Sequence, residues 1–265
     1  MATRNTARAT AMSAWAAVFV SARAATAAII PADADTFVQR QASAVNTNFG
    51  NNANVAAKNH DGTANNADRV AFVRFTAPAA PAAVLSASLT LTQGAATSST
   101  PTTMQLFGIR DGGFNENFVE GAGETGVAAS GANLPLTWNN NGYTDAVQTA
   151  GTDNNVNDAS PDLVLLDARV ATGTAVGSTL AFFGPQLTAF VAADTNGTLA
   201  FIVTASTTNA TYLGLFAPRD NADTSLRPAL RTDADAVPEP ASLAAVGVAA
   251  VGLLARRRAV TRSGS

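Results

Sequence analysis

Three carboxylates stand close together in the stretch GFNENFVEGAGETG, at Glu116, Glu120 and Glu124. Two carboxyl groups that flank a glycosidic bond can act as general acid and general base, so this spacing is compatible with cleavage of a sugar chain. Nothing around the three residues indicates burial or a partner that would shift a pKa. We therefore expect a solvated acidic loop, and we keep a polysaccharide-cleaving enzyme that uses residues 116–124 as an alternative.

The sequence offers almost no histidine or cysteine from which a catalytic or metal-binding site could be built. His60 is the only histidine and lies in the polar stretch KNHDGTANN, and the chain has no cysteine. The lack of cysteine excludes a thiolate nucleophile, a disulfide framework and a zinc–thiolate site, and one histidine cannot build a histidine metal cluster. No G-x-S-x-G stretch marks a nucleophilic serine. We expect His60 to be a solvated loop residue and the protein not to be an enzyme.

Oxygen ligands that suit calcium are dense in two segments. In one, Asp153, Asn155, Asn157 and Asp158 follow one another closely. The spacing begins like an EF-hand loop, but its sixth and twelfth positions hold Asp and Val instead of Gly and Glu, which excludes an EF-hand. An irregular structural calcium site at these four residues stays a candidate, and calcium is the only cofactor that we consider. The other segment contains Asp111, Asn115, Glu116 and Glu120.

A sugar site requires an exposed aromatic ring beside planar polar side chains. The stretch WNNNGY supplies both kinds of residue, through Trp138, Asn139, Asn140 and Tyr143. We take these four residues as the candidate ligand-binding site. The alternative is that Trp138 belongs to the hydrophobic core.

The elements that must position these residues are predicted to be short β-strands. Brief apolar–polar alternations are separated by Asn, Asp, Gly, Ser and Thr, without sustained helical periodicity. In LSASLTLT, for example, Leu85, Ala87, Leu89 and Leu91 are expected to face the core. One short helix is expected over residues 185–193, which begin with proline. The expected strands cover residues 35–39, 54–58, 69–75, 85–92, 103–109, 163–170, 179–183, 198–206 and 211–216.

This pattern of about nine short strands predicts an all-β sandwich or barrel, in which residues 110–162 form long loops. Seven of the 16 Lys and Arg residues lie within residues 1–32 and 241–265, which contain no acid. The other nine are outnumbered by all 19 Asp and Glu residues, so residues 33–240 carry a charge of about −10. This acidic body argues against nucleic acid as a partner, because phosphate binding requires clustered Lys and Arg.

The N-terminal segment predicts export. Two arginines precede an uncharged apolar run, and small residues then form A-x-A patterns at 22–24 and 32–34. A positive start, an apolar middle and a small-residue exit are typical of a secretory signal peptide. We expect a signal peptide over residues 1–34, recognised by the secretion machinery and cleaved within residues 24–34.

The C-terminal segment, residues 236–265, has three parts. It contains Pro238, Glu239 and Pro240, then an uncharged run over 241–255, then Arg256, Arg257 and Arg258. As a helix the uncharged run would be about 22 Å long, short of the roughly 30 Å hydrocarbon core of a membrane. We expect this hydrophobic helix to hold the chain in the membrane only transiently.

These three parts, in this order, resemble the bacterial PEP-CTERM sorting signal. The resemblance implies an exosortase-type processing protease as a partner, removal of the tail, and release or attachment at the cell surface. It also implies a bacterium that produces exopolysaccharide.

The body, residues 35–235, contains a series of short motifs. They are DTFV at 35–38, NTNFG at 46–50, RVAFVRF at 69–75, LTWNN at 136–140 and FAPRD at 216–220. In this order they resemble DNRLRE-type domains, which implies an extracellular jelly-roll β-sandwich related in shape to carbohydrate-binding modules. We expect a non-catalytic secreted or cell-surface protein of the exopolysaccharide-associated envelope that binds extracellular polysaccharide. A purely structural matrix protein is the second alternative.

Overall fold

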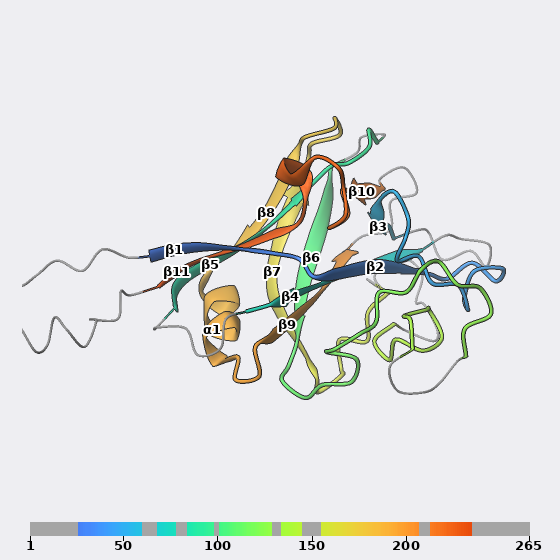
Figure 1. The fold of residues 1–265 in the computed structure, drawn as a ribbon, viewed down its shortest axis with the longest axis horizontal. Coiled ribbons are helices and arrows are strands. Elements are labelled where there is room, and N and C mark those ends of the chain that lie inside the picture. The colour runs from blue at the N-terminus through green and yellow to red at the C-terminus, as the bar shows by residue number, and fades with distance from the viewer. Residues whose placement is uncertain are drawn as a thin grey trace, which may run out of the picture.

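The computed structural model describes residues 26–59, 68–77, 84–97, 101–128, 134–144, 155–206 and 213–234. These residues form antiparallel β-sheets with one short helix, in a sandwich-like arrangement (Figure 1). The strands are β1 Thr26–Pro31, β2 Ala34–Gln39, β3 Val55–Ala57, β4 Arg69–Thr76, β5 Val84–Thr92, β6 Thr102–Ile109, β7 Leu163–Ala171, β8 Thr179–Phe183, β9 Thr198–Ala205, β10 Gly214–Phe216 and β11 Ala229–Ala234. The helix α1 spans Pro185–Ala193, and a 3-10 turn covers Thr224–Leu226.

Two sheets build the body. Sheet A has the strand order β1-β11-β5-β8 and sheet B has the order β2-β4-β9-β6-β7. Every neighbouring pair of strands in these two sheets is antiparallel. β3 and β10 form a separate antiparallel pair. The mostly β class predicted from the sequence is thereby confirmed.

Most of the expected elements are found where the residue pattern puts them. The expected strand at 179–183 and the expected helix at 185–193 coincide with β8 and α1. The expected strand at 163–170 lacks only the last residue of β7. Between β6 and β7 the described residues form turns and isolated bridges rather than further strands, as expected for long loops.

β1 is a strand that the sequence interpretation places inside the leader. It pairs along its whole length with β11, so that Thr26 lies opposite Ala234 and Pro31 opposite Ala229. Ile30 of β1 is buried in the core. A short Ala–Ile run has the same composition in a leader and in a strand, which is why the pattern did not separate them. The described chain thus begins and ends on neighbouring strands (Figure 1).

The main hydrophobic core lies between the two sheets. β5 contributes Ala87, Leu89 and Leu91, which are buried as the alternation predicts. Leu85 is 53% exposed instead. The pairing of β5 with β11 shifts register here, so that Ser86 and Val84 have partners on β11 and Leu85 is skipped. The alternation is thereby interrupted, and Val84 packs against the core in place of Leu85.

Sheet B is apolar on both of its faces. β4 places Phe75 in the core between the sheets and Phe72 in a second cluster on the opposite face. The long loops between β6 and β7 cover that outer face with their own apolar side chains, Phe118, Leu136, Trp138, Tyr143 and Val156. The loops are therefore part of the packed structure as well as connections between strands.

The part of the chain described here contains no helix that is long and apolar enough to cross a membrane. The expected C-terminal helix, with Pro238, Glu239, Pro240, Arg256, Arg257 and Arg258, lies outside the described residues.

Candidate functional site

The four residues of the candidate sugar site do not share an open surface. Trp138 and Tyr143 are buried, with 8% and 1% of their surfaces exposed, in the cluster on the outer face of sheet B. Asn140 is buried as well, and only Asn139 is exposed. Because both rings are enclosed, neither offers a face on which a sugar could stack. The structure supports the alternative, in which Trp138 belongs to the core.

Hydrogen bonds explain why this asparagine-rich loop folds inward. The Oδ1 atom of Asn140 accepts the N–H of Thr137 at 2.7 Å, and the Oδ1 atom of Asn141 accepts the N–H of Tyr143 at 2.8 Å. The hydroxyl of Tyr143 donates to the carbonyl of Phe114, and burial raises the pKa of this hydroxyl. The amide side chains thus satisfy the backbone of the loop and allow its rings to pack onto the sheet.

The candidate calcium residues are only partly described. Asp153 lies outside the described residues, as does His60. Asn155 is buried and adopts a φ of 65°, whereas Asn157 and Asp158 are exposed to solvent. A calcium site in this loop stays a prediction.

A different set of carboxylates converges where α1 ends. Ligand oxygens of Asp111, Glu116 and Asp194 all lie within 4.8 Å of one another. Glu116 is buried and accepts the side-chain amide of Asn196 at 3.0 Å. Asp111 accepts the hydroxyl of Thr195 at 2.6 Å. The sequence pattern names Asp111 and Glu116 but not Asp194, which follows α1 and reaches the other two only through the fold.

Two of these carboxylates, Glu116 and Asp194, have raised pKa values. The pKa of Glu116 is raised, first by burial and further by the charges of Asp111 and Asp194. Burial and the charge of Asp111 also raise the pKa of Asp194. Oxygen atoms at this separation could hold a hard cation such as Ca²⁺. The amides of Asn196 and Gly112 already donate to Glu116, so the cluster is held together by hydrogen bonds of the protein itself.

The rest of the acidic loop is engaged in structural contacts. Glu120 forms an ion pair with Arg219, and the backbone N–H of Arg219 donates to Asp35. Asp35 is 1% exposed, and its burial raises its pKa to about 7, with the charge of Glu120 adding to the effect. Glu124 accepts a backbone N–H within its own turn at 2.8 Å. Each of the three glutamates in residues 116–124 therefore accepts donors from the protein.

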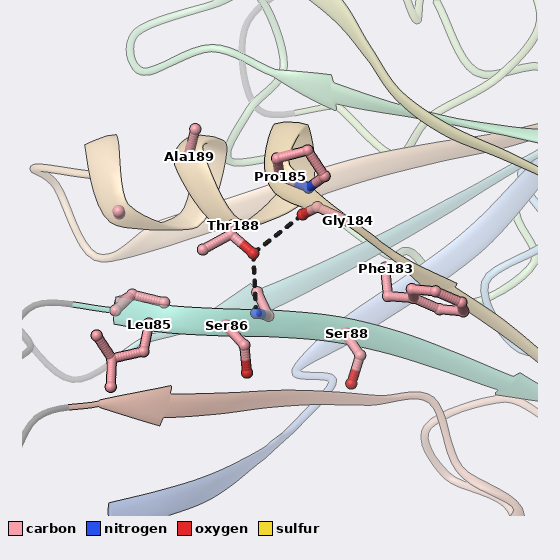
Figure 2. A pocket seen from close by; sticks show the side chains of 11 residues that line it. Leu85, Ser86, Ser88, Phe183, Gly184, Pro185, Thr188 and Ala189 are labelled. Atoms are coloured by element: carbon pink, nitrogen blue, oxygen red, sulfur yellow. Dashed lines mark hydrogen bonds between the residues drawn. The ribbon is translucent and has the colours of Figure 1, made fainter. Parts of the chain in front are cut away.

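An open cleft of about 600 Å³ lies between β5 and the first turns of α1 (Figure 2). It is lined mainly by apolar residues, among them the half-exposed Leu85 and Phe183. Thr188 joins its two sides, because its hydroxyl accepts the N–H of Ala87 at 3.2 Å and donates to the carbonyl of Gly184 at 3.0 Å. The cleft begins where β8 stops and the helix replaces it as the neighbour of β5 (Figure 2).

Phe183 links this cleft to the edge of sheet B. The guanidinium carbon of Arg169, on β7, lies 3.6 Å from the centre of the Phe183 ring. Asp167 binds Arg169 at 2.7 Å and accepts the N–H of Phe183 at 2.8 Å. Arg169 also donates to the carbonyl of Phe183 at 2.9 Å. A charged pair thus fixes the position of a ring that stays 50% exposed.

Two segments of the chain match models of known families. Residues 26–123 match the model of carbohydrate-binding module family 96, and residues 236–258 match that of the PEP-CTERM protein-sorting motif. The first match runs from the first residue of β1 to beyond β6. No curated protein matches the chain. The two resemblances seen in the sequence, of the body to a carbohydrate-binding module and of the tail to a PEP-CTERM signal, are confirmed.

Proposed function

We propose that this chain, which carries a carbohydrate-binding module and a PEP-CTERM sorting motif, is a non-catalytic glycan-binding protein of the cell surface. The observation that carries the proposal is the match of residues 26–123 to a carbohydrate-binding family. That match covers strands of both sheets, so it concerns the folded body and not an isolated loop. In this proposal the sandwich is of the jelly-roll type and its ligand is polysaccharide of the exopolysaccharide-associated envelope.

The sorting motif supplies the location. A PEP-CTERM motif implies export, processing by an exosortase and sorting to the cell surface. β11 ends at Ala234 and the motif begins at residue 236, so removal of the tail leaves both sheets complete. We also propose that a signal peptide precedes β1 and that the membrane contact through the C-terminal helix is transient.

The contacts of the acidic loop support a non-catalytic role. A glycosidase places two carboxyl groups on opposite sides of the bond that it cleaves. Here Glu116 is buried against Asn196, and Glu120 is paired with Arg219. None of the glutamates in residues 116–124 lines the cleft beside α1. The contacts of these glutamates hold the loop in the fold and require no catalytic role.

One experiment separates the proposal from its alternatives. The exported protein is incubated with exopolysaccharide purified from the same bacterium, and bound protein and newly formed reducing ends are measured together. We expect saturable binding without new reducing ends. If the wild type forms new reducing ends and Glu120→Gln does not, the polysaccharide-cleaving alternative is established. If the protein neither binds nor cleaves the polysaccharide, the structural matrix protein is the function that remains.

A further inference from the structure

We propose that one face of the body lies against a phospholipid bilayer for as long as the C-terminal tail is attached. This face, called the exit face below, is the part of the outer surface of sheet A that carries Leu85, Ile29, Arg231 and Phe183. The proposal goes beyond glycan binding. It rests on one part of the proposed function, the transient membrane contact of the C-terminal helix, and adds to it the surface of the body that meets the membrane.

The first argument is that both terminal segments join the body at the same end. β1 begins at Thr26 and β11 ends at Ala234, and these two residues lie directly opposite each other. Ala234 also lies opposite Val84, where β5 begins. This end of sheet A is on the left in Figure 1. The sorting motif, residues 236–258, is therefore joined to the end of the sheet at which Leu85 lies.

The second argument is the short connection between the body and the tail. Six residues, 235–240, separate Ala234 from the uncharged run that begins at residue 241. A fully extended chain spans at most about 3.3–3.6 Å per residue, so this connection spans about 20 Å at most. Leu85 follows Val84, the partner of Ala234. A run that is inserted in a bilayer therefore keeps Leu85 close to the membrane surface.

The third argument is that apolar side chains are exposed on this face. Leu85 is 53% exposed, Ile29 62% and Phe183 50%. The strand register forms one row across the sheet, in which Ile29 lies opposite Arg231, Arg231 opposite Ser88 and Ser88 opposite Phe183. Residues that lie directly opposite each other share a face of the sheet. The next row faces the core and is buried, through Ile30, Leu230, Leu89 and Phe182.

The chemistry of the exit face suits the surface of a bilayer. Proteins that lie in the membrane interface place apolar side chains at the boundary of headgroups and acyl chains, with Lys or Arg near the phosphates. Arg231 is exposed between Ile29 and Phe183. Asp233, the acid on β11, accepts the hydroxyl of Ser86 at 2.7 Å. The apolar cleft beside Leu85 extends the surface to α1, which contains no charged residue (Figure 2).

The contact depends on the tail. Residues 33–240 carry a charge of about −10, so the body has no long-range attraction to a bilayer. The few apolar side chains of the exit face bury little area. A tethered tail raises the effective concentration of the body at the membrane surface, which makes a weak contact sufficient. Removal of the tail then releases the body and leaves the exit face open to solvent.

The test uses the exported protein, produced without an exosortase so that its tail is intact, in vesicles of phosphatidylcholine and phosphatidylethanolamine. The chain has no cysteine, so single substitutions can each carry one environment-sensitive dye. Leu85→Cys reports on the exit face and Val248→Cys on the tail. Val176→Cys is the matched control, because Val176 is 57% exposed and precedes β8 at the opposite end of sheet A. Quenching by nitroxide-labelled lipid measures the contact of each dye with the bilayer.

We expect the dyes at positions 248 and 85 to be quenched, with quenching at 85 at least about twofold stronger than at 176. Ile29→Ser and Phe183→Ser, introduced together at these exposed positions, should weaken the quenching at 85. Removal of residues 235–265 should abolish it. Melting temperatures show that the variants are folded.

Three results would overturn the proposal. Equal quenching at positions 85 and 176, with the dye at 248 quenched, would overturn the exit face and leave the membrane contact of the tail standing. An unquenched dye at 248 would overturn the membrane contact of the tail as well. A dye at 85 that is shielded from water without vesicles would show that the tail or a second copy of the chain covers this face instead of lipid.

Discussion

The backbone N–H of Arg219 donates to the buried carboxylate of Asp35, and this bond joins the segment that closes the fold to strand β2. The side chain of Arg219 pairs in turn with Glu120 of the acidic loop. Three segments far apart in the sequence therefore meet in one charged network. Two of the motifs that mark the family resemblance, DTFV and FAPRD, contribute to it directly. Their role in this network is to connect the parts of the fold.

Asp35 is expected to make the protein less stable as the pH rises. Its pKa is 3.8 in a model peptide and about 7 in the fold, because burial disfavours its charge. The folded state then binds a proton that the unfolded state releases, so the contribution of Asp35 to stability is fully present below about pH 4 and is lost as the pH rises through about 7. By the 1.4 kcal/mol that accompany each unit of pKa, the loss reaches about 4 kcal/mol.

Asp35→Asn keeps an oxygen that can accept the N–H of Arg219 but removes the titration. Urea unfolding at pH 5 and pH 8 should show a smaller difference in the free energy of unfolding for this variant than for the wild type. Equal differences in both proteins would show that Asp35 is already ionised at pH 5.

Trp138→Ala should reduce stability without reducing glycan affinity. Trp138 is 8% exposed and packs on the outer face of sheet B, so its removal leaves a cavity. Truncating a buried Trp to Ala typically costs about 3–5 kcal/mol. Chemical unfolding measures this loss, and titration with exopolysaccharide below the unfolding transition measures affinity. A stable variant that has lost binding would restore Trp138 to the sugar site.

Glu116→Gln should raise the melting temperature at pH 8 in the presence of EDTA. The pKa of Glu116 is raised by burial and by its acidic neighbours, so its charge opposes folding above its unfolded pKa. Glutamine retains an acceptor for the N–H of Gly112 and relieves the repulsion from Asp111 and Asp194. Asp223→Asn is a contrasting variant, because the exposed carboxylate of Asp223 accepts the N–H and the hydroxyl of Ser225 and its pKa is lowered, so its charge favours folding. A lower melting temperature for Glu116→Gln would contradict this account.

The exported protein should begin at or just before residue 26. β1 starts at Thr26, pairs with β11 over its whole length and contributes Ile30 to the core. Cleavage after the A-x-A pattern at 22–24 leaves this strand in place, whereas cleavage after 32–34 removes it. Intact-mass measurement of the protein from the culture decides between the two. A first residue near 35 would mean that sheet A lacks β1 in the exported form.

Local patterns predicted the strands well because they depend on alternation along the chain. Leu89 and Leu91 are buried as LSASLTLT indicates. The near-continuous apolar run in β4 carries a further signal, since a strand buried on both faces does not alternate. Phe72 and Phe75 of β4 lie on opposite faces, and both are completely buried. The apolar run in β4 therefore predicts that a further layer of apolar side chains packs on the outer face of sheet B.

The site residues were harder to predict because their environment depends on how distant segments pack. Trp138 looks like a loop aromatic in the sequence, yet the outer face of sheet B buries it. Phe183 looks like a core residue of a strand, yet β8 is an edge strand that ends beside an open cleft. Asp194 joins Asp111 and Glu116 only when α1 is folded. None of these relationships is visible within a local stretch of sequence.

The most direct test of the central claim is a titration of the exported protein with exopolysaccharide purified from the same bacterium, with reducing ends measured in the same samples. A non-catalytic glycan-binding protein should bind saturably and leave the number of reducing ends unchanged. Reducing ends that accumulate with time, or the lack of any binding, would contradict this function.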